Sequence, residues 1–378
     1  MAGLPLSPAD ALVARVSMRS NEGARTSPLA VDCVMATDPL AVLSTPSGPL
    51  PSRRPRPIDV PPPLATLAGR QLGPVSRAQC AAVGMPPGRI NRLVARGDWR
   101  TVTRGVVLTD LGAVPAGDWA ARARQRAVVA SLAGGPESLL VGLAALAAHG
   151  VEGLPLGFVP EFTTTTGTHV RSRPEVRARR LRRRDDVPDH PKVTYAHGLR
   201  TAGPLWALAQ ALPGLDRDHA VAILDSAVHT GKFRMEDAPL LLALMSDCRG
   251  VRSLRSWLPL ADGRSESPLE TRARLVCQDH GVPPDDLQRV IRDAVGIFVA
   301  RCDMVWDLGG GRLLIVEMDG GHHRKDGQID VDNARDNALH RLGHVVYHFT
   351  WRDLLNGLVH ATVRAELIRA GRLAAAQR

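Results

Sequence analysis

The sequence predicts an α/β protein made of several domains. The chain has 378 residues, 44% of them are hydrophobic, and helix-like and strand-like patterns alternate after a proline-rich beginning. A chain of this length can form two or three hydrophobic cores. We therefore divide it into a tail (1–63), an N-terminal section (64–112), a middle section (113–260) and a C-terminal section (261–378).

Composition narrows the expected partners and location. The formal net charge is +10, which suits a polyanion such as DNA, and only three of the 48 basic residues are lysines. A high arginine content is also typical of GC-rich coding DNA, so the charge alone does not decide the partner. The five cysteines are scattered without a CxxC pair, which indicates free thiols in a cytoplasmic protein. No apolar run is long enough to span a membrane, so we expect no membrane partner.

The tail and the N-terminal section differ in pattern. Residues 1–63 are rich in Pro, Ser and Ala without a period, which predicts a disordered segment. The N-terminal section then predicts a helix, a capped helix, a third helix and a hairpin, at Leu64–Gln71, Arg77–Val83 (capped by Ser76), Gly88–Arg96 and Asp98–Thr109. This order is that of a winged helix-turn-helix, a DNA-binding unit.

Arginines recur along the third helix and the hairpin of this section. Arg89, Arg92 and Arg96 share one helix face, opposite the apolar Ile90 and Leu93. Two more basic residues lie on the predicted wing, namely Arg100 and Arg104. We predict that these five arginines bind DNA; the alternative is a solvated basic face without a partner.

This part of the sequence resembles a known protein family. The run Arg92-Leu93-Val94-Ala95-Arg96-Gly97-Asp98-Trp99, followed by Gly105-Val106-Val107, is similar to the N-terminal domain of AbiEi-type antitoxins. In the middle section, the sequence from Gly198 to Leu205 resembles a further region of these proteins and extends the similarity to about Val228. The resemblance implies a DNA-binding regulator with a toxin as partner.

The middle section predicts a mixed α/β arrangement. Helices are expected at Trp119–Leu132 and Ser138–His149, and strands at Phe158–Thr164 and Val193–Tyr195. The arginine-rich run from Arg171 to Asp186 predicts a solvated loop or strand edge, with phosphate contact as the alternative.

The C-terminal section predicts the order α-β-β-β-α-β-α. Ser267 caps the first helix, and Glu270 is either its capping partner or an acid that faces a metal. The later elements are a helix at Ile329–Leu342, a strand at Val345–Phe349 and a last helix capped by Thr350. The last helix has an expected buried stripe of Trp351, Leu354, Leu355, Leu358 and Val359.

Three acids cluster in the predicted hairpin of this section. Its strands, Ile297–Trp306 and Arg312–Asp319, flank Gly309-Gly310-Gly311. A turn centred on Gly310 places Asp303 opposite Glu317, because each lies seven residues away, and Asp319 shares a face with Glu317. Such carboxylates repel one another unless a hard divalent cation binds them. If the turn is off-centre, the acids simply face water.

These residues also resemble a known family. Asp303 and Glu317-x-Asp319-Gly320-x-x-His323 are similar to the nuclease core of restriction-endonuclease-like, PD-(D/E)xK proteins, especially their Vsr-like branch. The resemblance covers about Ser265 to Leu367. It implies that Asp303 and Glu317 bind Mg²⁺ or Mn²⁺, with Glu270 as a further acid. Asp319 stands where many relatives carry lysine, and His323 matches the histidine that follows the Asp-Gly in this branch. We expect His323 to act in proton transfer, as general base or by protonating the leaving group.

Three functions are weighed from the sequence. The first is a Mg²⁺-dependent DNA endonuclease in DNA repair or phage defence, with Asp303, Glu317, Asp319 and His323 as catalytic residues. The alternative is an AbiEi-type transcriptional regulator with a non-catalytic nuclease fold, and the third is an interaction protein without a catalytic step. A homodimer and a toxin partner are both left open.

Overall fold

The protein is described by a computed structural model. The described residues are 60–164, 171–180, 192–320 and 328–374, without the side chains of 328–332. Residues 1–59, which make up most of the predicted disordered tail, therefore lie outside the description, as do residues 181–186 of the arginine-rich run. Within the described part, no helix is both long enough and apolar enough to cross a membrane.

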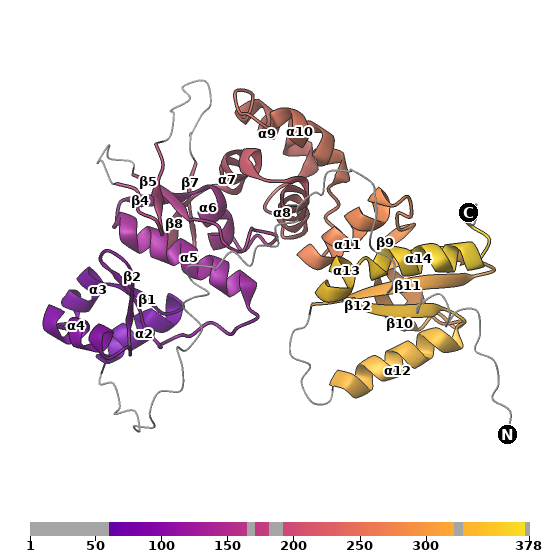
Figure 1. The fold of residues 1–378 in the computed structure, drawn as a ribbon, viewed down its shortest axis with the longest axis horizontal. Coiled ribbons are helices and arrows are strands. Elements are labelled where there is room, and N and C mark those ends of the chain that lie inside the picture. Colours follow the sequence, from indigo (N-terminus) through magenta and orange to yellow (C-terminus); the bar gives the residue numbers. More distant parts are fainter. Residues whose placement is uncertain (1–59, 165–170, 181–191, 321–327, 375–378) are drawn as a thin grey trace, which may run out of the picture. The chain divides into compact units, whose positions relative to one another are not determined.

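The N-terminal section has the predicted winged-helix order (Figure 1). Its elements are α2 (Pro62–Arg70), β1 (Pro74–Ser76), α3 (Arg77–Ala82), α4 (Pro87–Ala95), β2 (Arg100–Thr103) and β3 (Val106–Leu108). The strands form an antiparallel sheet in the order β1-β3-β2. Ser76 and Gln79 form a capping box that starts α3, and the core includes the buried Ile90, Leu93 and Trp99.

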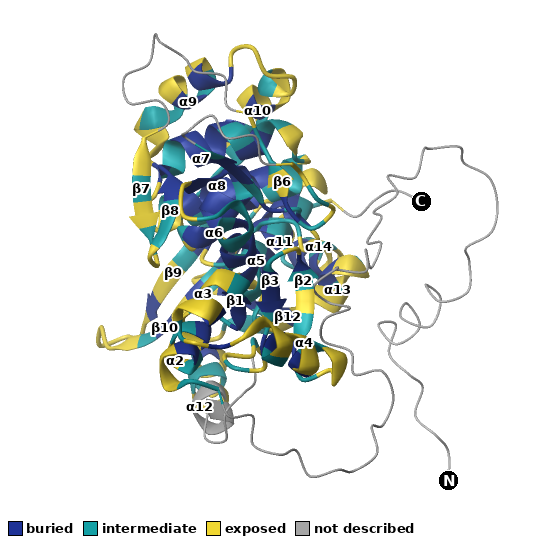
Figure 2. Ribbon diagram, turned by 90° about the vertical axis from the view of Figure 1, so that its left-hand side faces the viewer, coloured by how far each residue is buried: buried dark blue, intermediate teal, exposed yellow. Residues whose placement is uncertain are grey.

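The middle section contains a five-stranded sheet with helices packed against it. In chain order the elements are α5 (Trp119–Gly134), β4 (Ser138–Val141), α6 (Gly142–Ala148), β5 (Glu161–Thr164), β6 (Arg177–Ala178), β7 (Val193–Ala196), β8 (Leu199–Ala202), α7 (Pro204–Ala211), α8 (Arg217–His229), α9 (Ala238–Leu244) and α10 (Val251–Trp257). The strand order is β6-β5-β4-β8-β7. Helix α6 is mostly buried, as Figure 2 shows, and lies in the largest core of the described residues.

One prediction for this section is wrong. The expected helix Ser138–His149 is a strand, β4, followed by the shorter helix α6. All four residues of β4 are buried, and the strand pairs with β5 on one side and β8 on the other. Both partners come later in the chain, so the apolar run by itself did not distinguish a buried strand from a helix.

The C-terminal section shows the predicted order of helices and strands. Its elements are α11 (Pro268–Asp279), β9 (Asp286–Arg292), β10 (Phe298–Gly309), β11 (Arg312–Asp319), α12 (Gln328–Arg341), β12 (Val345–Thr350), α13 (Trp351–Leu355) and α14 (Leu358–Arg369). The sheet order is β12-β11-β10-β9, with β11 and β12 parallel and the other pairs antiparallel. One hydrophobic cluster joins the sheet to α11 and α14, and another joins it to α12.

The hairpin between β10 and β11 has the register that the sequence predicts. Met304 pairs with Val316 and Trp306 with Leu314, so both pairs are centred on residue 310. Gly309, Gly310 and Gly311 all have positive φ, between 64° and 82°. Only glycine adopts this conformation readily, which explains the three consecutive glycines at the turn.

The prediction for the last helix is partly wrong. Thr350 does cap a helix, but the chain breaks at Gly357, where φ is 72°, and forms α13 and α14. Leu354 and Val359 are buried as expected, whereas the other members of the predicted stripe are exposed, namely Trp351, Leu355 and Leu358. The break changes the helical phase, so a single stripe does not continue through both helices.

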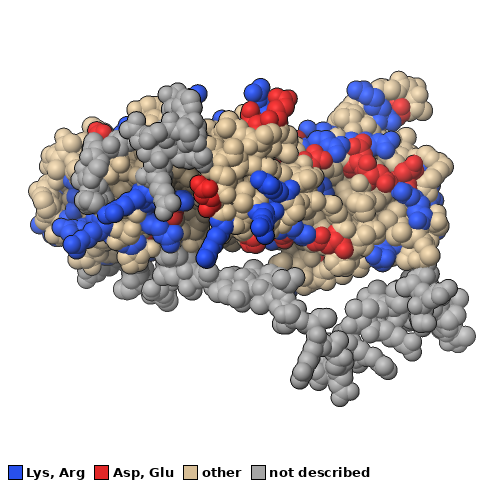
Figure 3. Space-filling view, turned by 90° about the horizontal axis from the view of Figure 1, so that it is seen from above, with Lys and Arg blue, Asp and Glu red and all other residues tan. Residues whose placement is uncertain are grey.

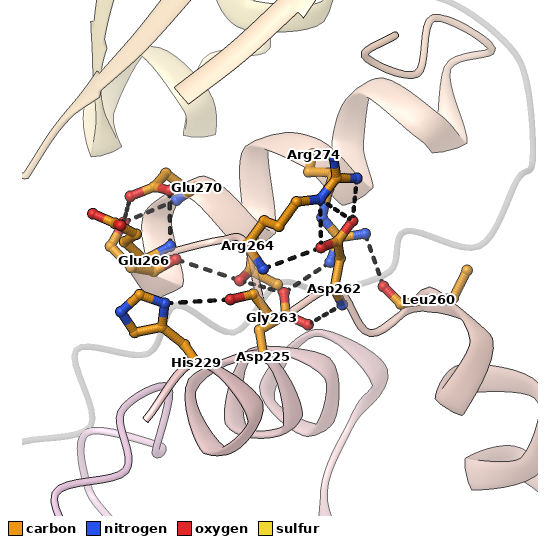
Figure 4. A network of polar contacts seen from close by, with 11 residues as sticks. Asp225, His229, Leu260, Asp262, Gly263, Arg264, Glu266, Glu270 and Arg274 are labelled. Atoms are coloured by element: carbon orange, nitrogen blue, oxygen red, sulfur yellow. Dashed lines mark hydrogen bonds and ion pairs between the residues drawn. The ribbon is translucent and has the colours of Figure 1, made fainter. Parts of the chain in front are cut away.

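A buried ion pair joins the middle and C-terminal sections through α8 and α11 (Figure 4). The Asp225 carboxylate on α8 accepts hydrogen bonds from Arg274 Nη2 at 2.8 Å and Thr271 Oγ1 at 2.7 Å. It also accepts one from the backbone N–H of Asp262 at 2.7 Å. Burial raises the pKa of Asp225, and the charge of Arg274 opposes this effect. A second pair between the same helices, Arg217 with Asp279, lies at the surface.

Candidate functional site

Helix α4 presents arginines on the side away from its core. Ile90 and Leu93 are buried, whereas Arg92 and Arg96 are exposed and Arg89 is partly exposed. The Arg96 guanidinium donates to the carboxylate of Asp98, with Nε 2.6 Å from Oδ2. The helix therefore offers positive charge to an anionic surface, although Asp98 offsets part of the charge of Arg96.

The two wing arginines lie in different environments. Arg104 is exposed at the β2–β3 turn, and its backbone carbonyl accepts a hydrogen bond from Arg173 Nη1 of the middle section at 3.0 Å. Arg100 is partly buried, and this burial lowers the pKa of its guanidinium. Figure 3 shows one face of the molecule, on which basic side chains gather in groups with acidic side chains between some of them.

In the C-terminal section, Asp303 lies where β10 stops pairing with β11. The last recorded pair is Met304 with Val316, and beyond it Asp303 Oδ2 accepts the backbone N–H of Met318 at 2.9 Å. The side chain of Asp303 thus takes the place of a main-chain acceptor beside β11. Asp303 is fixed next to the strand that carries Glu317.

Gln288 of β9 connects two of the acids. Its Nε2 donates to Asp303 Oδ1 at 3.1 Å and to Glu270 Oε2 at 3.0 Å. Gln288 also has a φ of 51°, a left-handed conformation that costs a non-glycine residue about 1–2 kcal/mol. Leu287 and Ile291, on either side of it, pack into different hydrophobic clusters, although residues four apart share a face in a regular strand.

Sequence reasoning missed Gln288. In the sequence it is one polar residue in an ordinary strand pattern, and its kink and contacts appear only when α11 and β10 are packed against β9. No local signal could have identified it.

Glu270 hydrogen-bonds both to the N-terminal cap of α11 and to Gln288 of β9. Its Oε1 accepts the hydroxyl of Ser267 at 2.8 Å, and its Oε2 accepts the backbone N–H of Glu266 at 2.9 Å as well as Gln288. The return bond of a capping box would go to the N–H of Ser267, so this detail of the prediction is wrong. Burial, followed by the negative charge of Asp303, raises the pKa of Glu270.

Glu317 is the most strongly perturbed acid of the group. It is 8% exposed, and its Oε1 is buried without a hydrogen-bond partner among the described residues. Burial, followed by the charge of Asp303, raises the pKa of Glu317 to about 8, although Arg335 acts in the opposite direction. A buried carboxylate oxygen without a donor is costly, which indicates that the site is suited to a further ligand.

Three residues near Glu317 come from α12 and β12 and were not predicted. Arg335 Nη2 lies 3.5 Å from Glu317 Oε1, and His348 Nε2 lies 2.8 Å from Asp336 Oδ2. His348 is also the pairing partner of Glu317 in the parallel sheet. Arg335 precedes the buried Leu339 by four residues, so helical spacing could have placed it on the side of α12 that faces the sheet.

The remaining predicted site residues are less well defined. Asp319 ends β11, pairs with Thr350 and is partly exposed. His323 lies outside the described residues. The structure therefore brings together Glu270, Asp303 and Glu317, here called the acid cluster.

The acid cluster can be tested for its fit to a metal. Among the described residues, no group of three or more His, Cys, Asp or Glu side chains could hold a metal ion. Mg²⁺, however, is often bound by one or two carboxylates, while water and substrate oxygens complete its octahedron. Asp303 and Glu317 fit this second type of site, because Glu317 Oε1 makes no hydrogen bond to any described residue.

Comparisons with known proteins identify related sequences for part of the chain. Residues 63–108 match the family described as "Transcriptional regulator, AbiEi antitoxin". Two proteins of Mycobacterium tuberculosis are each 33% identical over 115 residues: the uncharacterized protein MT2308 of strain CDC 1551 / Oshkosh and the uncharacterized protein Rv2248 of strain ATCC 25618 / H37Rv. The aligned stretch is 30% of this chain and 42% of each relative. The family match supports the resemblance of the N-terminal section and does not extend to the acid cluster.

Proposed function

We propose, starting from the antitoxin-family match of residues 63–108, that the chain is a DNA-binding regulator whose N-terminal section holds duplex DNA. The observation that carries the proposal is helix α4, where Arg92 and Arg96 are exposed opposite the buried Ile90 and Leu93. In a helix-turn-helix the second helix lies in the major groove, and flanking basic residues contact phosphates. We propose a toxin protein as a second binding partner of the chain.

The test measures duplex affinity of the full chain by fluorescence anisotropy at several salt concentrations. A variant with Arg89, Arg92 and Arg96 all changed to Ala should bind at least about tenfold more weakly at low salt, because phosphate contacts and released counterions dominate affinity. The matched control changes three exposed arginines on or beside α10: Arg249, Arg252 and Arg255. Equal losses in both variants would show that only net charge matters and would refute the proposed surface.

A second candidate function is cation-dependent hydrolysis of DNA phosphodiesters at the acid cluster. It is favoured by Glu317, whose buried Oε1 lies near Asp303 and has no hydrogen bond within the described part of the chain. When Mg²⁺ is bound, it would orient water and stabilise charge on the phosphate. In this chain Asp303 and Glu317 would hold the ion, and Gln288 would keep Asp303 and Glu270 in place.

This candidate is tested with plasmid DNA and either Mg²⁺ or Mn²⁺. Asp303→Asn and Glu317→Gln should each abolish cleavage and weaken Mn²⁺ binding measured by calorimetry. Asp247→Asn, which changes an exposed carboxylate, should leave both unchanged. A parent chain that neither cleaves any DNA form nor binds Mn²⁺ would leave the regulator as the function of the chain. Asp319 and His323 are carried into this test as proposed catalytic residues, each changed to Ala.

A further inference from the structure

Arg335 lies beside the acid cluster, and among the described residues its guanidinium makes only long contacts with carboxylates. Its Nη2 is 3.5 Å from Glu317 Oε1, a distance typical of charge attraction without a good hydrogen bond. Its Nε is buried and has no hydrogen-bond partner among the described residues. The side chain is 30% exposed, so one side of the guanidinium can reach a ligand from solvent.

The second carboxylate near Arg335, that of Asp336, makes no close hydrogen bond to it. Asp336 Oδ1 lies 3.9 Å from Arg335 Nε, too far for a hydrogen bond. Its other oxygen, Oδ2, lies 2.8 Å from His348 Nε2. Arg335 therefore keeps most of its capacity to bind an anion, although it is surrounded by carboxylates.

A phosphodiester that approaches the acid cluster meets negative charge from those of Glu270, Asp303 and Glu317 that are deprotonated. A bound divalent cation offsets part of this charge, and a second positive group is still needed to hold the phosphate. A guanidinium matches phosphate geometry with two parallel N–H groups and is the side chain best suited to this contact.

We propose that Arg335 is the phosphate-binding residue of the acid cluster. Without a divalent cation, Arg335 lies beside Glu317, and its positive charge lowers the pKa of that carboxyl group. When a cation binds Asp303 and Glu317, the guanidinium is displaced from Glu317 and donates to a phosphate oxygen of DNA. This inference rests on the second candidate function and adds to it the residue that contacts the substrate.

The proposal predicts opposite effects on two ligands. In Arg335→Met, calorimetry with Mn²⁺ alone should show binding tighter by about fivefold or more, because a positive charge that competes for Glu317 is gone. The gain in duplex affinity on adding Mg²⁺, measured by anisotropy, should fall by about tenfold, because a charge-assisted bidentate contact is lost. Arg335→Lys should keep the parent's Mn²⁺ affinity and recover only part of the Mg²⁺-dependent DNA affinity.

Controls separate this role from a structural one. Arg341→Met, on an exposed position of the same helix, should change neither affinity. If Arg335→Met weakens both Mn²⁺ and DNA binding, or leaves both unchanged, the proposal is refuted. A parent chain whose duplex affinity is the same with and without Mg²⁺ also refutes it.

The same data distinguish failure of the site from failure of the inference. If Asp303→Asn and Glu317→Gln leave Mn²⁺ binding unchanged, the acid cluster is not a cation site, and Arg335 does not have the proposed role. If those two variants lose Mn²⁺ while Arg335→Met behaves like the parent, only the assignment of Arg335 is wrong.

Discussion

The N-terminal and C-terminal sections arrange charge in opposite ways. Residues 64–112 contain seven arginines, no lysine and two acids, whereas residues 261–378 contain 16 basic and 17 acidic residues. In the first, Arg92 and Arg96 face solvent; in the second, Glu270 and Glu317 are buried. Surface cations attract DNA with little effect on folding, whereas buried acids oppose folding unless they are neutralised. Affinity for DNA is therefore expected from the N-terminal section and dependence on a cation from the C-terminal one.

The largest effect should come from breaking the buried ion pair between α8 and α11. Asp225→Ala leaves Arg274, whose side chain is 8% exposed, without its carboxylate. Loss of one partner of a buried pair typically lowers the free energy of unfolding by about 3–5 kcal/mol. The measurement is urea unfolding of the full chain.

The surface pair between the same helices provides the control. Asp279→Ala breaks the contact with Arg217 at the surface and should lower the free energy of unfolding by about 1 kcal/mol or less. Similar losses in Asp225→Ala and Asp279→Ala would mean that burial does not set the strength of these contacts.

A smaller effect per pH unit, which accumulates over several pH units, is expected from the titration of Glu317. Folding raises the pKa of Glu317 from 4.5 to about 8. Between these two pH values, the folded protein therefore keeps a proton on Glu317 that the unfolded chain has already lost. Stability should fall as pH rises through this window, by up to about 1.4 kcal/mol per pH unit, and should level off above it.

Unfolding at a series of pH values, without divalent cations, measures this dependence. Glu317→Gln should lack the slope and should be the more stable protein at pH 8. Glu236→Gln, at a highly exposed carboxyl group, should follow the parent curve. If the unsubstituted protein has the same pH dependence as Glu317→Gln, then the pKa of Glu317 is not raised in the folded state.

The smallest effect concerns a single surface arginine. Arg92→Ala should remove one phosphate contact and reduce the slope of log affinity against log salt by about 0.9. Arg255→Ala, exposed on α10, should leave the slope unchanged. An unaltered slope in Arg92→Ala would remove this residue from the DNA-binding surface.

Features set by neighbouring residues could be predicted from the sequence. Ser76, Ser267 and Thr350 cap helices as expected, and the glycines at 309–311 fix the hairpin register. In each case the physical signal lies within a few residues: a side chain that accepts a helix N–H, or a backbone that needs positive φ.

Features that depend on packing between residues far apart in the sequence could not be predicted in this way. Strand β4 is a strand because β5 and β8 pair with it, and Gln288 joins the acid cluster because α11 and β10 meet at β9. The approach of Asp303 to Glu317 follows from register, but the burial that raises the pKa of Glu317 depends on the whole section.

The Asp225 network also bears on how the chain can be shortened. A boundary at residue 260, natural from sequence patterns, passes between Asp225 and the residues that it binds, Thr271 and Arg274. Leu260 itself accepts a hydrogen bond from Arg274 Nη1 at 2.8 Å. A fragment that starts at Ser265 would leave that guanidinium without any of these acceptors. A shortened protein that retains the acid cluster should therefore begin before α8, at or upstream of Asp216.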